Sequence, residues 1–335
     1  MPEPKERLAP PRPRAIYWIA SLALAGVLLY YSLRGIEWLR VWQIVRGARP
    51  LGVALVLVIM SSTLFLRAFR WRVLLSAEGS VPISLAFWAT SAGYLGNNVL
   101  PARAGEVVRT VMISARSGMS KAFVLTTALS ERVVDAITLI TISAITLLSL
   151  PERPGWLADA AKPFAVLGLV GVACIALLPA YESLWFRVLA RLPVPHRLRD
   201  TVEHGLRQGL QGIRSFHDRG RLCRFLALTA LIWFMDGVTT VVGAHAIGLS
   251  ISLPLAFLLI AGLGLGSALP STPGYVGIYQ FVAVSVLTPF GFSRTDAIAY
   301  ILLFQAINYV IVLSWGLIGL GQQRRPVLTV EETAP

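Results

Sequence analysis

Two carboxylates, Glu131 and Asp135, lie one helical turn apart within a long apolar stretch of the chain. Carboxylates at membrane depth are costly and normally face a bundle interior, a partner or water. Because like charges at this spacing repel each other, we expect a cation beside them. The candidates are Arg103, Arg109 and Arg132. Two interpretations stay open: a buried ion-pair network that only locks the fold, or a polar part of a transport path.

A second group of charges, Arg103, Glu106 and Arg109, begins just after Asn98 and Pro101. A guanidinium group matches a phosphate in bidentate geometry, and a phospholipid must carry its phosphate across an apolar slab. Glu106 can pair with either arginine in the empty site, or receive the ammonium group of an aminoacylated lipid. The alternative is that both arginines only anchor this segment at the headgroups. The sequence offers no nucleophile–base set, metal cluster or Walker motif, so we expect neither an enzyme nor a cofactor or metal.

The composition indicates an integral membrane protein that must hold these charges between apolar helices. Of 335 residues, 56% are hydrophobic and only 14% are charged, and the mean hydropathy is +0.68. A soluble domain carries nearer a quarter of charged residues. In a membrane protein, a net charge of +13 indicates basic cytoplasmic loops that contact anionic headgroups. No motif supports nucleic-acid binding. Six stretches reach the length of a helical span: 15–33, 50–69, 121–150, 163–181, 222–247 and 297–320.

The basic loops predict how the chain is oriented. The segment 182–224 holds nine arginines, so its connector, 182–221, should be cytoplasmic. The cluster of Arg67, Arg70 and Arg72 agrees, and both termini are then expected in the cytoplasm, at the cytoplasmic (inner) membrane. One connection, 34–49, is basic although this topology places it outside.

Two further segments, 82–119 and 254–290, are interrupted by Gly and Pro and are predicted as re-entrant hairpins. With six spans, each hairpin must enter and leave on one side, so 50–150 and 222–320 would be repeats of opposite polarity. Two full crossings per hairpin would give eight spans instead. Because broken backbone in a membrane needs protein or water around it, the hairpin tips predict a polar cavity. The fold class is therefore an all-α polytopic helical bundle with an inverted-topology repeat, forming a single membrane domain.

Three motifs in this chain resemble a known family. They are Asn98-x-x-Pro101-x-Arg103-x-Gly105-Glu106-x-x-Arg109, Glu131-Arg132-x-x-Asp135 and Pro270-x-x-Pro273-Gly274-x-x-Gly277. Together they look like the flippase-like transmembrane region of lysylphosphatidylglycerol synthases, and the resemblance covers nearly the whole chain. It implies a protein that moves lipids between leaflets. The chain departs from the family at Tyr275, where many members have Gly, and at Gln280, where they have an acid.

From the residues and the resemblance together we predict a lipid translocase that moves a phosphate-bearing lipid or glycolipid through a polar cavity between the hairpins. The expected partners are membrane lipids: an anionic or aminoacylated phospholipid, a hopanoid or a polyprenyl-linked lipid. Self-association into a homo-oligomer stays open. The predicted substrate-binding residues are Asn98, Arg103, Glu106, Arg109, Glu131, Arg132, Asp135, Asp236, Pro270, Pro273, Gly274 and Gly277.

Two alternatives remain beside translocation. One is an intramembrane lipid-modifying enzyme, and the other is a secondary transporter of a small soluble anion. The chain ends soon after the last predicted span, so we expect the soluble aminoacyl-transferase domain of the full synthases to be absent, which argues against lipid synthesis. Lipid-facing openings between helices would favour translocation over transport of a soluble anion. Coupling to an ion gradient could use Glu131, Asp135 or Asp236.

Overall fold

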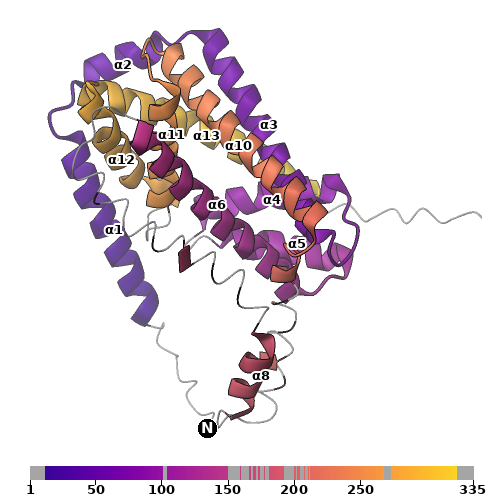
Figure 1. The fold of residues 1–335 in the computed structure, drawn as a ribbon. Coiled ribbons are helices and arrows are strands. Elements are labelled where there is room, and N and C mark those ends of the chain that lie inside the picture. The colour runs from indigo at the N-terminus through magenta and orange to yellow at the C-terminus, as the bar shows by residue number, and fades with distance from the viewer. Residues whose placement is uncertain are drawn as a thin grey trace, which may run out of the picture.

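The computed structural model describes residues 12–100, 104–149, 181–191, 212–267 and 273–322, with scattered positions between 159 and 210. Within these residues every regular element is a helix (Figure 1). The first half contains α1 (Arg12–Leu33), α2 (Trp38–Arg46), α3 (Pro50–Leu75), α4 (Ile83–Val99), α5 (Gly105–Ser117) and α6 (Lys121–Ser149). The second half contains α8 (Glu182–Arg191), α10 (Arg219–Ala246), α11 (Leu253–Gly266), η2 (Pro273–Tyr275), α12 (Ile278–Leu287), η3 (Thr288–Phe290) and α13 (Arg294–Gln322).

Three of the described helices, α3, α10 and α13, are long and apolar enough to cross a membrane by themselves. A fourth candidate is the pair formed by Leu22–Leu33 of α1 and by α2, which is bent by 87° between the two helices. Helix α6 has 29 residues but carries both members of the acidic pair, Glu131 and Asp135. Helices therefore cover five of the six predicted spans, while the sixth, 163–181, lies mostly outside the described residues.

Both predicted hairpins are pairs of shorter helices with a break between them. The first pair is α4 and α5, and the second is α11 with η2 and α12. In the first pair the helices are almost in backbone contact, since a Cβ on Gly105 would lie 1.9 Å from the carbonyl oxygen of Gly93. A residue with a side chain at this position would push α4 and α5 apart. Glycine is therefore required here by packing.

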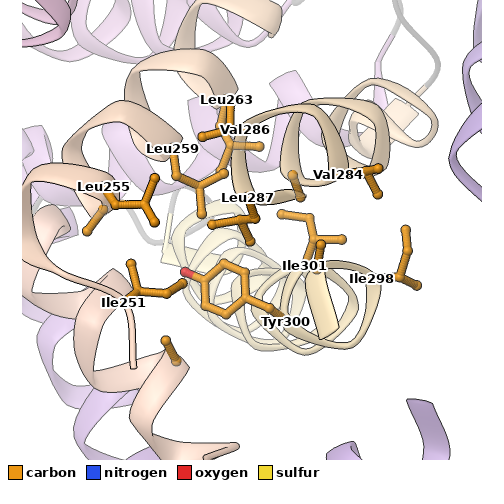
Figure 2. Close-up of a cluster of buried hydrophobic side chains, with 14 of the residues drawn as sticks. Ile251, Leu255, Leu259, Leu263, Val284, Val286, Leu287, Ile298, Tyr300 and Ile301 are labelled. Carbon is orange, nitrogen blue, oxygen red and sulfur yellow. The ribbon is translucent and has the colours of Figure 1, made fainter. Parts of the chain in front are cut away.

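Each hairpin has its own buried apolar cluster, although both hairpins also contact α6 and α13. Figure 2 shows the apolar cluster that joins α11 and α12 to α13, with Leu259, Leu287 and Tyr300 among its buried members. The first hairpin packs through a separate buried cluster against α3 and α6, with Trp71 and Phe123 among its fully buried members. Helix α10 lies along α3, α13 lies along α4 and α11 lies along α6, so the two halves of the chain interlock. The breaks of both hairpins are thereby held within one bundle.

Candidate substrate cavity

A cavity of about 910 Å³ lies between the two broken helix pairs. Its walls come from α3, α4, α5 and α6 in the first half, and from α10, α11, η2, α12 and α13 in the second half. Most of the lining is apolar or aromatic. The charged and amide-bearing side chains of the lining are Arg67, Asn97, Asn98, Glu106, Arg132, Asp135, Asp236 and Asn308.

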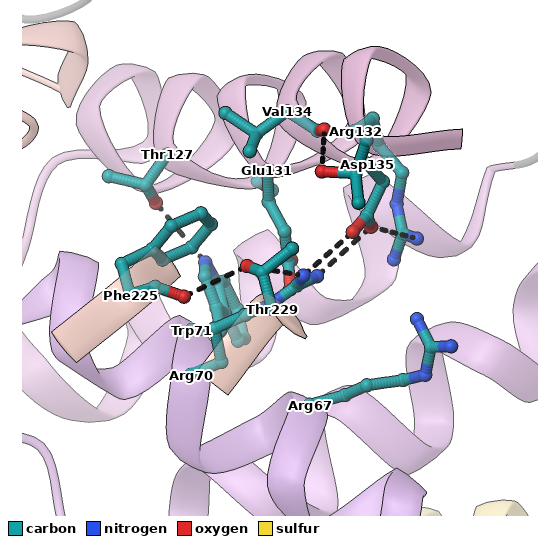
Figure 3. A network of polar contacts seen from close by, with 12 residues as sticks. Arg67, Arg70, Trp71, Thr127, Glu131, Arg132, Val134, Asp135, Phe225 and Thr229 are labelled. Atoms are coloured by element: carbon teal, nitrogen blue, oxygen red, sulfur yellow. Dashed lines mark hydrogen bonds and ion pairs between the residues drawn. The ribbon is translucent and has the colours of Figure 1, made fainter. Parts of the chain in front are cut away.

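A fully buried arginine, Arg70 on α3, holds the two acids of α6. Its guanidinium donates to Glu131 at 2.7 and 3.2 Å and to Asp135 at 2.7 and 3.0 Å. It also donates to the hydroxyl of Thr229 on α10 at 3.1 Å. Figure 3 shows these contacts between α3 and α6. Because Arg70 bridges both carboxylates, it relieves the repulsion that the sequence indicates between them.

The network of ion pairs extends from Glu131 to α5 of the first hairpin. Arg109 on α5 lies 2.8 Å from Glu131 and 2.5 Å from Glu106. Its guanidinium also stacks over the ring of Trp71, 4.4 Å from the centroid, and donates to the carbonyl of Ala128 at 3.3 Å. These contacts fix α5 against α3 and α6 and leave Arg109 buried.

Arg132 completes a closed ring of alternating charges. It lies 3.0 Å from Glu106 and 3.4 Å from Asp135. Asp135 is also paired with Arg70, which closes the ring. Each arginine of this charge ring contacts two carboxylates, and each carboxylate contacts two arginines; the members are Arg70, Glu131, Arg109, Glu106, Arg132 and Asp135. Three positive and three negative groups leave the charge ring formally neutral.

Within the charge ring, Arg132 is the member most open to the cavity. Its side chain is 31% exposed, while the side chains of Arg70 and Arg109 are almost completely buried. Its guanidinium lies over the ring of Tyr94, 5.5 Å from the centroid. A ligand in the cavity can therefore contact Arg132 without disrupting the buried half of the charge ring, which consists of Arg70, Glu131 and Arg109.

Beside the charge ring lies a separate ion pair, Arg67 of α3 with Asp236 of α10, and both residues line the cavity. The guanidinium of Arg67 also stacks over Trp233, 5.2 Å from the centroid. Figure 3 shows Arg67 extending away from Arg70, toward the side on which Arg132 lies. The pair joins the first and second halves of the chain at the cavity wall.

The break in the first hairpin is held by Asn97, which accepts a hydrogen bond from the backbone N–H of Gly105 at 3.0 Å and donates to Glu106 at 3.3 Å. Asn97 at the end of α4 therefore binds the first backbone N–H of α5 across the break. Asn98 donates to the carbonyl of Tyr94 at 2.9 Å and lines the cavity. The predicted polar groups at this break thus lie next to the charge ring through Glu106.

The second hairpin uses neutral groups at the corresponding place. Gly274 has φ +71°, and a Cβ there would lie 1.5 Å from the Tyr309 hydroxyl oxygen, so the position requires glycine. Its carbonyl accepts hydrogen bonds from Gln305 at 3.1 Å and Tyr309 at 3.0 Å. Gln280 accepts from the Gly277 N–H at 2.8 Å and donates to Gln305 at 2.5 Å. In this chain Gln280 holds the break in place.

The structure divides the predicted substrate-binding residues into groups. Those that line the cavity are Asn98, Glu106, Arg132, Asp135 and Asp236. Glu131 and Arg109 belong to the charge ring but lie behind the lining. Gly274 and Gly277 shape the second break, and Pro273 is the first residue of η2. Arg103 and Pro270 lie outside the described residues.

Sequence reasoning missed two arginines, Arg67 and Arg70, as members of the site. They were assigned with Arg72 to a cytoplasmic basic cluster. The structure places Arg70 in the charge ring and Arg67 in the pair with Asp236. The available signal was the spacing, because residues 67 and 70 share one face of a helix and a polar face within an apolar helix points inward.

Comparisons with known proteins relate the chain to a membrane-protein family. The family described as lysylphosphatidylglycerol synthase TM region matches residues 18–316. Glycosyltransferase AglD of Haloferax volcanii is 24% identical over 348 residues, which cover 90% of this chain and 54% of that protein. The chain thus spans about half the length of that relative. UPF0104 membrane protein MJ1078 of Methanocaldococcus jannaschii is 23% identical over 226 residues, covering 66% of this chain and 91% of that protein. No solved structure matches.

Proposed function

The chain belongs to the lysylphosphatidylglycerol synthase TM-region family, and from that premise we propose that it translocates a phosphate-bearing lipid between the two leaflets of a membrane. The headgroup enters the cavity between the hairpins, while the acyl chains stay in the bilayer. The broader conclusion, an integral membrane protein related to lipid metabolism, rests on the family and the apolar helices.

One observation carries the proposal: the cavity combines charged groups with an edge of exposed apolar side chains. Arg132 and Arg67 supply guanidinium groups inside the cavity. Val107 of α5 and Leu129 of α6 also line it, and they are 55% and 48% exposed. In a bilayer, exposed valine and leucine face acyl chains, so this edge supports entry of a lipid rather than of a soluble anion.

Phosphate recognition falls to Arg132 and Arg67 among the described cavity residues. Arg132 lies 3.0 Å from Glu106 and 3.4 Å from Asp135. A phosphodiester can replace one of these carboxylates and keep the guanidinium paired. Because Arg70 and Arg109 retain the remaining carboxylate contacts, the exchange leaves the buried half of the charge ring in place. Arg103 remains a proposed participant from the sequence.

Alternating access follows if residues 50–150 and 222–320 are inverted repeats in the inner membrane. The two halves would rock about the helix pair formed by α3 and α10, which is the most extensive helix contact between them. The Arg67–Asp236 pair crosses this contact. In this mechanism the cavity opens first toward one leaflet and then toward the other.

The test is reconstitution of the purified protein alone into vesicles that contain phosphatidylglycerol carrying one fluorescent, shortened acyl chain. A membrane-impermeant quencher reports which probe molecules are in the outer leaflet, and mass spectrometry reports the headgroup. We expect the protein to exchange the probe between leaflets without ATP and without altering it, and Arg132→Gln to slow the exchange. A chemically altered probe would establish an enzyme instead. Leakage of inorganic phosphate without movement of the probe would establish a transporter of soluble anions.

A further inference from the structure

Asp236 differs from the other carboxylates that line the cavity. Glu106 and Asp135 each contact two arginines of the charge ring. Asp236 pairs with Arg67, and within the described part of the chain its carboxylate has no second cationic contact. Loss of one arginine therefore leaves Glu106 or Asp135 still paired, whereas loss of Arg67 leaves Asp236 without a cation.

Among the residues that the structure describes, the charged groups at the cavity balance one another. The charge ring contains three arginines and three carboxylates, and Arg67 and Asp236 add one charge of each sign. A phosphodiester headgroup brings one further negative charge into this low-dielectric region. An uncompensated charge at such a place is costly, so an added positive charge would stabilise the bound headgroup.

A phosphate that binds Arg67 has a single carboxylate to displace. Its ion pair has one partner, while Arg132 is held by two. Its guanidinium is also stacked on Trp233, which keeps it in the cavity when the carboxylate leaves. Once Arg67 pairs with the phosphate, Asp236 is a carboxylate without a cation, which low-dielectric surroundings tolerate only in the neutral form or with a new cation.

We propose that Asp236 takes up one proton when a phosphate-bearing headgroup binds Arg67, so that the anionic lipid and the proton move together. The proton comes from the aqueous side to which the cavity is open and forms an O–H bond on the Asp236 carboxyl group. It leaves as H⁺ when the headgroup departs and the Arg67–Asp236 pair re-forms. This inference rests on the proposed translocation and adds that the step is electroneutral.

The surroundings of Asp236 favour a proton over another internal partner. Arg70 and Asp135 also lie within electrostatic range of Asp236, but Arg70 is held by Glu131 and Asp135 and is fully buried. The charge of Asp135 opposes a second free carboxylate nearby. Helix α11 has no titratable residue, and α13 contributes only Arg294 and Asp296 in its first turn besides its tyrosines. Within these helices no spare cation replaces Arg67.

The experiment measures proton uptake during binding, using purified protein in detergent. Short-chain phosphatidylglycerol is the anionic probe, and diacylglycerol of the same chain length is the uncharged control. Calorimetry gives the binding stoichiometry, and a pH indicator in weakly buffered solution gives the protons taken up. Wild-type protein should take up about one proton per phosphatidylglycerol bound, and its affinity should fall about tenfold per unit rise in pH while Asp236 is ionised in the empty protein.

Two variants assign the proton to a residue. Asp236→Asn should bind phosphatidylglycerol with no proton uptake and a flat pH dependence. Asp296→Asn is the matched control, because it removes another ion-paired aspartate that does not line the cavity, and it should behave as the wild type does. Equal proton uptake by Asp236→Asn would overturn the assignment to this residue.

The wild-type measurement decides the inference even if a variant fails to fold. Binding of phosphatidylglycerol without proton uptake and without pH dependence would overturn proton coupling and leave the proposed translocation intact. Binding that requires sodium but takes up no proton would replace the proton by a metal cation. Absence of any binding of phosphatidylglycerol would overturn the inference together with its premise.

Discussion

Replacing Arg70 with methionine should strongly destabilise the fold, and the size of the effect can be worked out from the charge ring. Arg70 donates four hydrogen bonds to two buried carboxylates. At about 1.5–3 kcal/mol for each bond to a charged group, simple addition overestimates the loss, since such energies are not additive. Arg109 and Arg132 still hold Glu131 and Asp135 after the substitution. We therefore expect a loss of about 3–5 kcal/mol, which is typical of a broken buried ion pair.

The assay is reversible unfolding in mixed micelles, followed by helical circular dichroism. The matched control is Arg224→Met on α10, because Arg224 is exposed and bonds only its own helix among the described residues; it should change stability by less than about 0.5 kcal/mol. The double variant Arg70→Met with Glu131→Gln removes one charge of each sign, so it should be more stable than Arg70→Met alone. A free energy of unfolding of Arg70→Met within about 1 kcal/mol of the wild-type value would refute the reasoning.

Two further predictions test the hairpins. Ser80 and Ser250 are exposed, and each lies three residues before the entry helix of a hairpin. In a chain whose native cysteines are replaced, single cysteines at these two positions should react with impermeant thiol reagents from opposite sides of the membrane. Labelling of both positions from the same side would contradict the inverted repeat. Gly105→Ala should destabilise the protein by about 1–3 kcal/mol, because the new Cβ would overlap α4. Gly26→Ala is its control, since no atom lies within 4 Å of the added Cβ, and equal effects of the two substitutions would show that the α4–α5 contact is looser than described.

The breaks in the helices could be predicted because they depend on local chemistry. Proline lacks a backbone N–H and glycine tolerates positive φ, so Pro101 and Gly274 indicate an interruption in any surrounding sequence. The acidic pair of α6 could also be assigned to the interior, since its spacing within an apolar helix fixes one face. These features follow from a few neighbouring residues.

The partners of those acids could not be predicted in the same way. Arg70 precedes Glu131 by 61 residues and Arg67 precedes Asp236 by 169 residues, so both pairings depend on how α3, α6 and α10 pack. Near the end of an apolar helix, an arginine that faces a partner and one that faces anionic headgroups give the same sequence pattern. The positive-inside rule favoured the second interpretation, and tertiary packing produced the first.

The charge ring has features of both interpretations of the acidic pair. Its buried members, Arg70, Glu131 and Arg109, lie away from the cavity lining, as expected of groups that lock α3, α5 and α6 together. Arg132 and Glu106 extend the same ring to the cavity wall. The network is therefore structural on one side, and on the other it presents charged groups to the proposed substrate.

The most direct test of headgroup passage through the cavity compares two valines on α5. Val107 lines the cavity and is 55% exposed, while Val111, one turn further along, is 46% exposed and does not line it. Each is replaced by the single cysteine of an otherwise cysteine-free chain, and exchange of the fluorescent phosphatidylglycerol is measured in vesicles before and after a bulky maleimide is attached. Modification at position 107 should stop the exchange, and modification at position 111 should leave its rate unchanged. Continued exchange at the unmodified rate with position 107 fully labelled would contradict passage through this cavity.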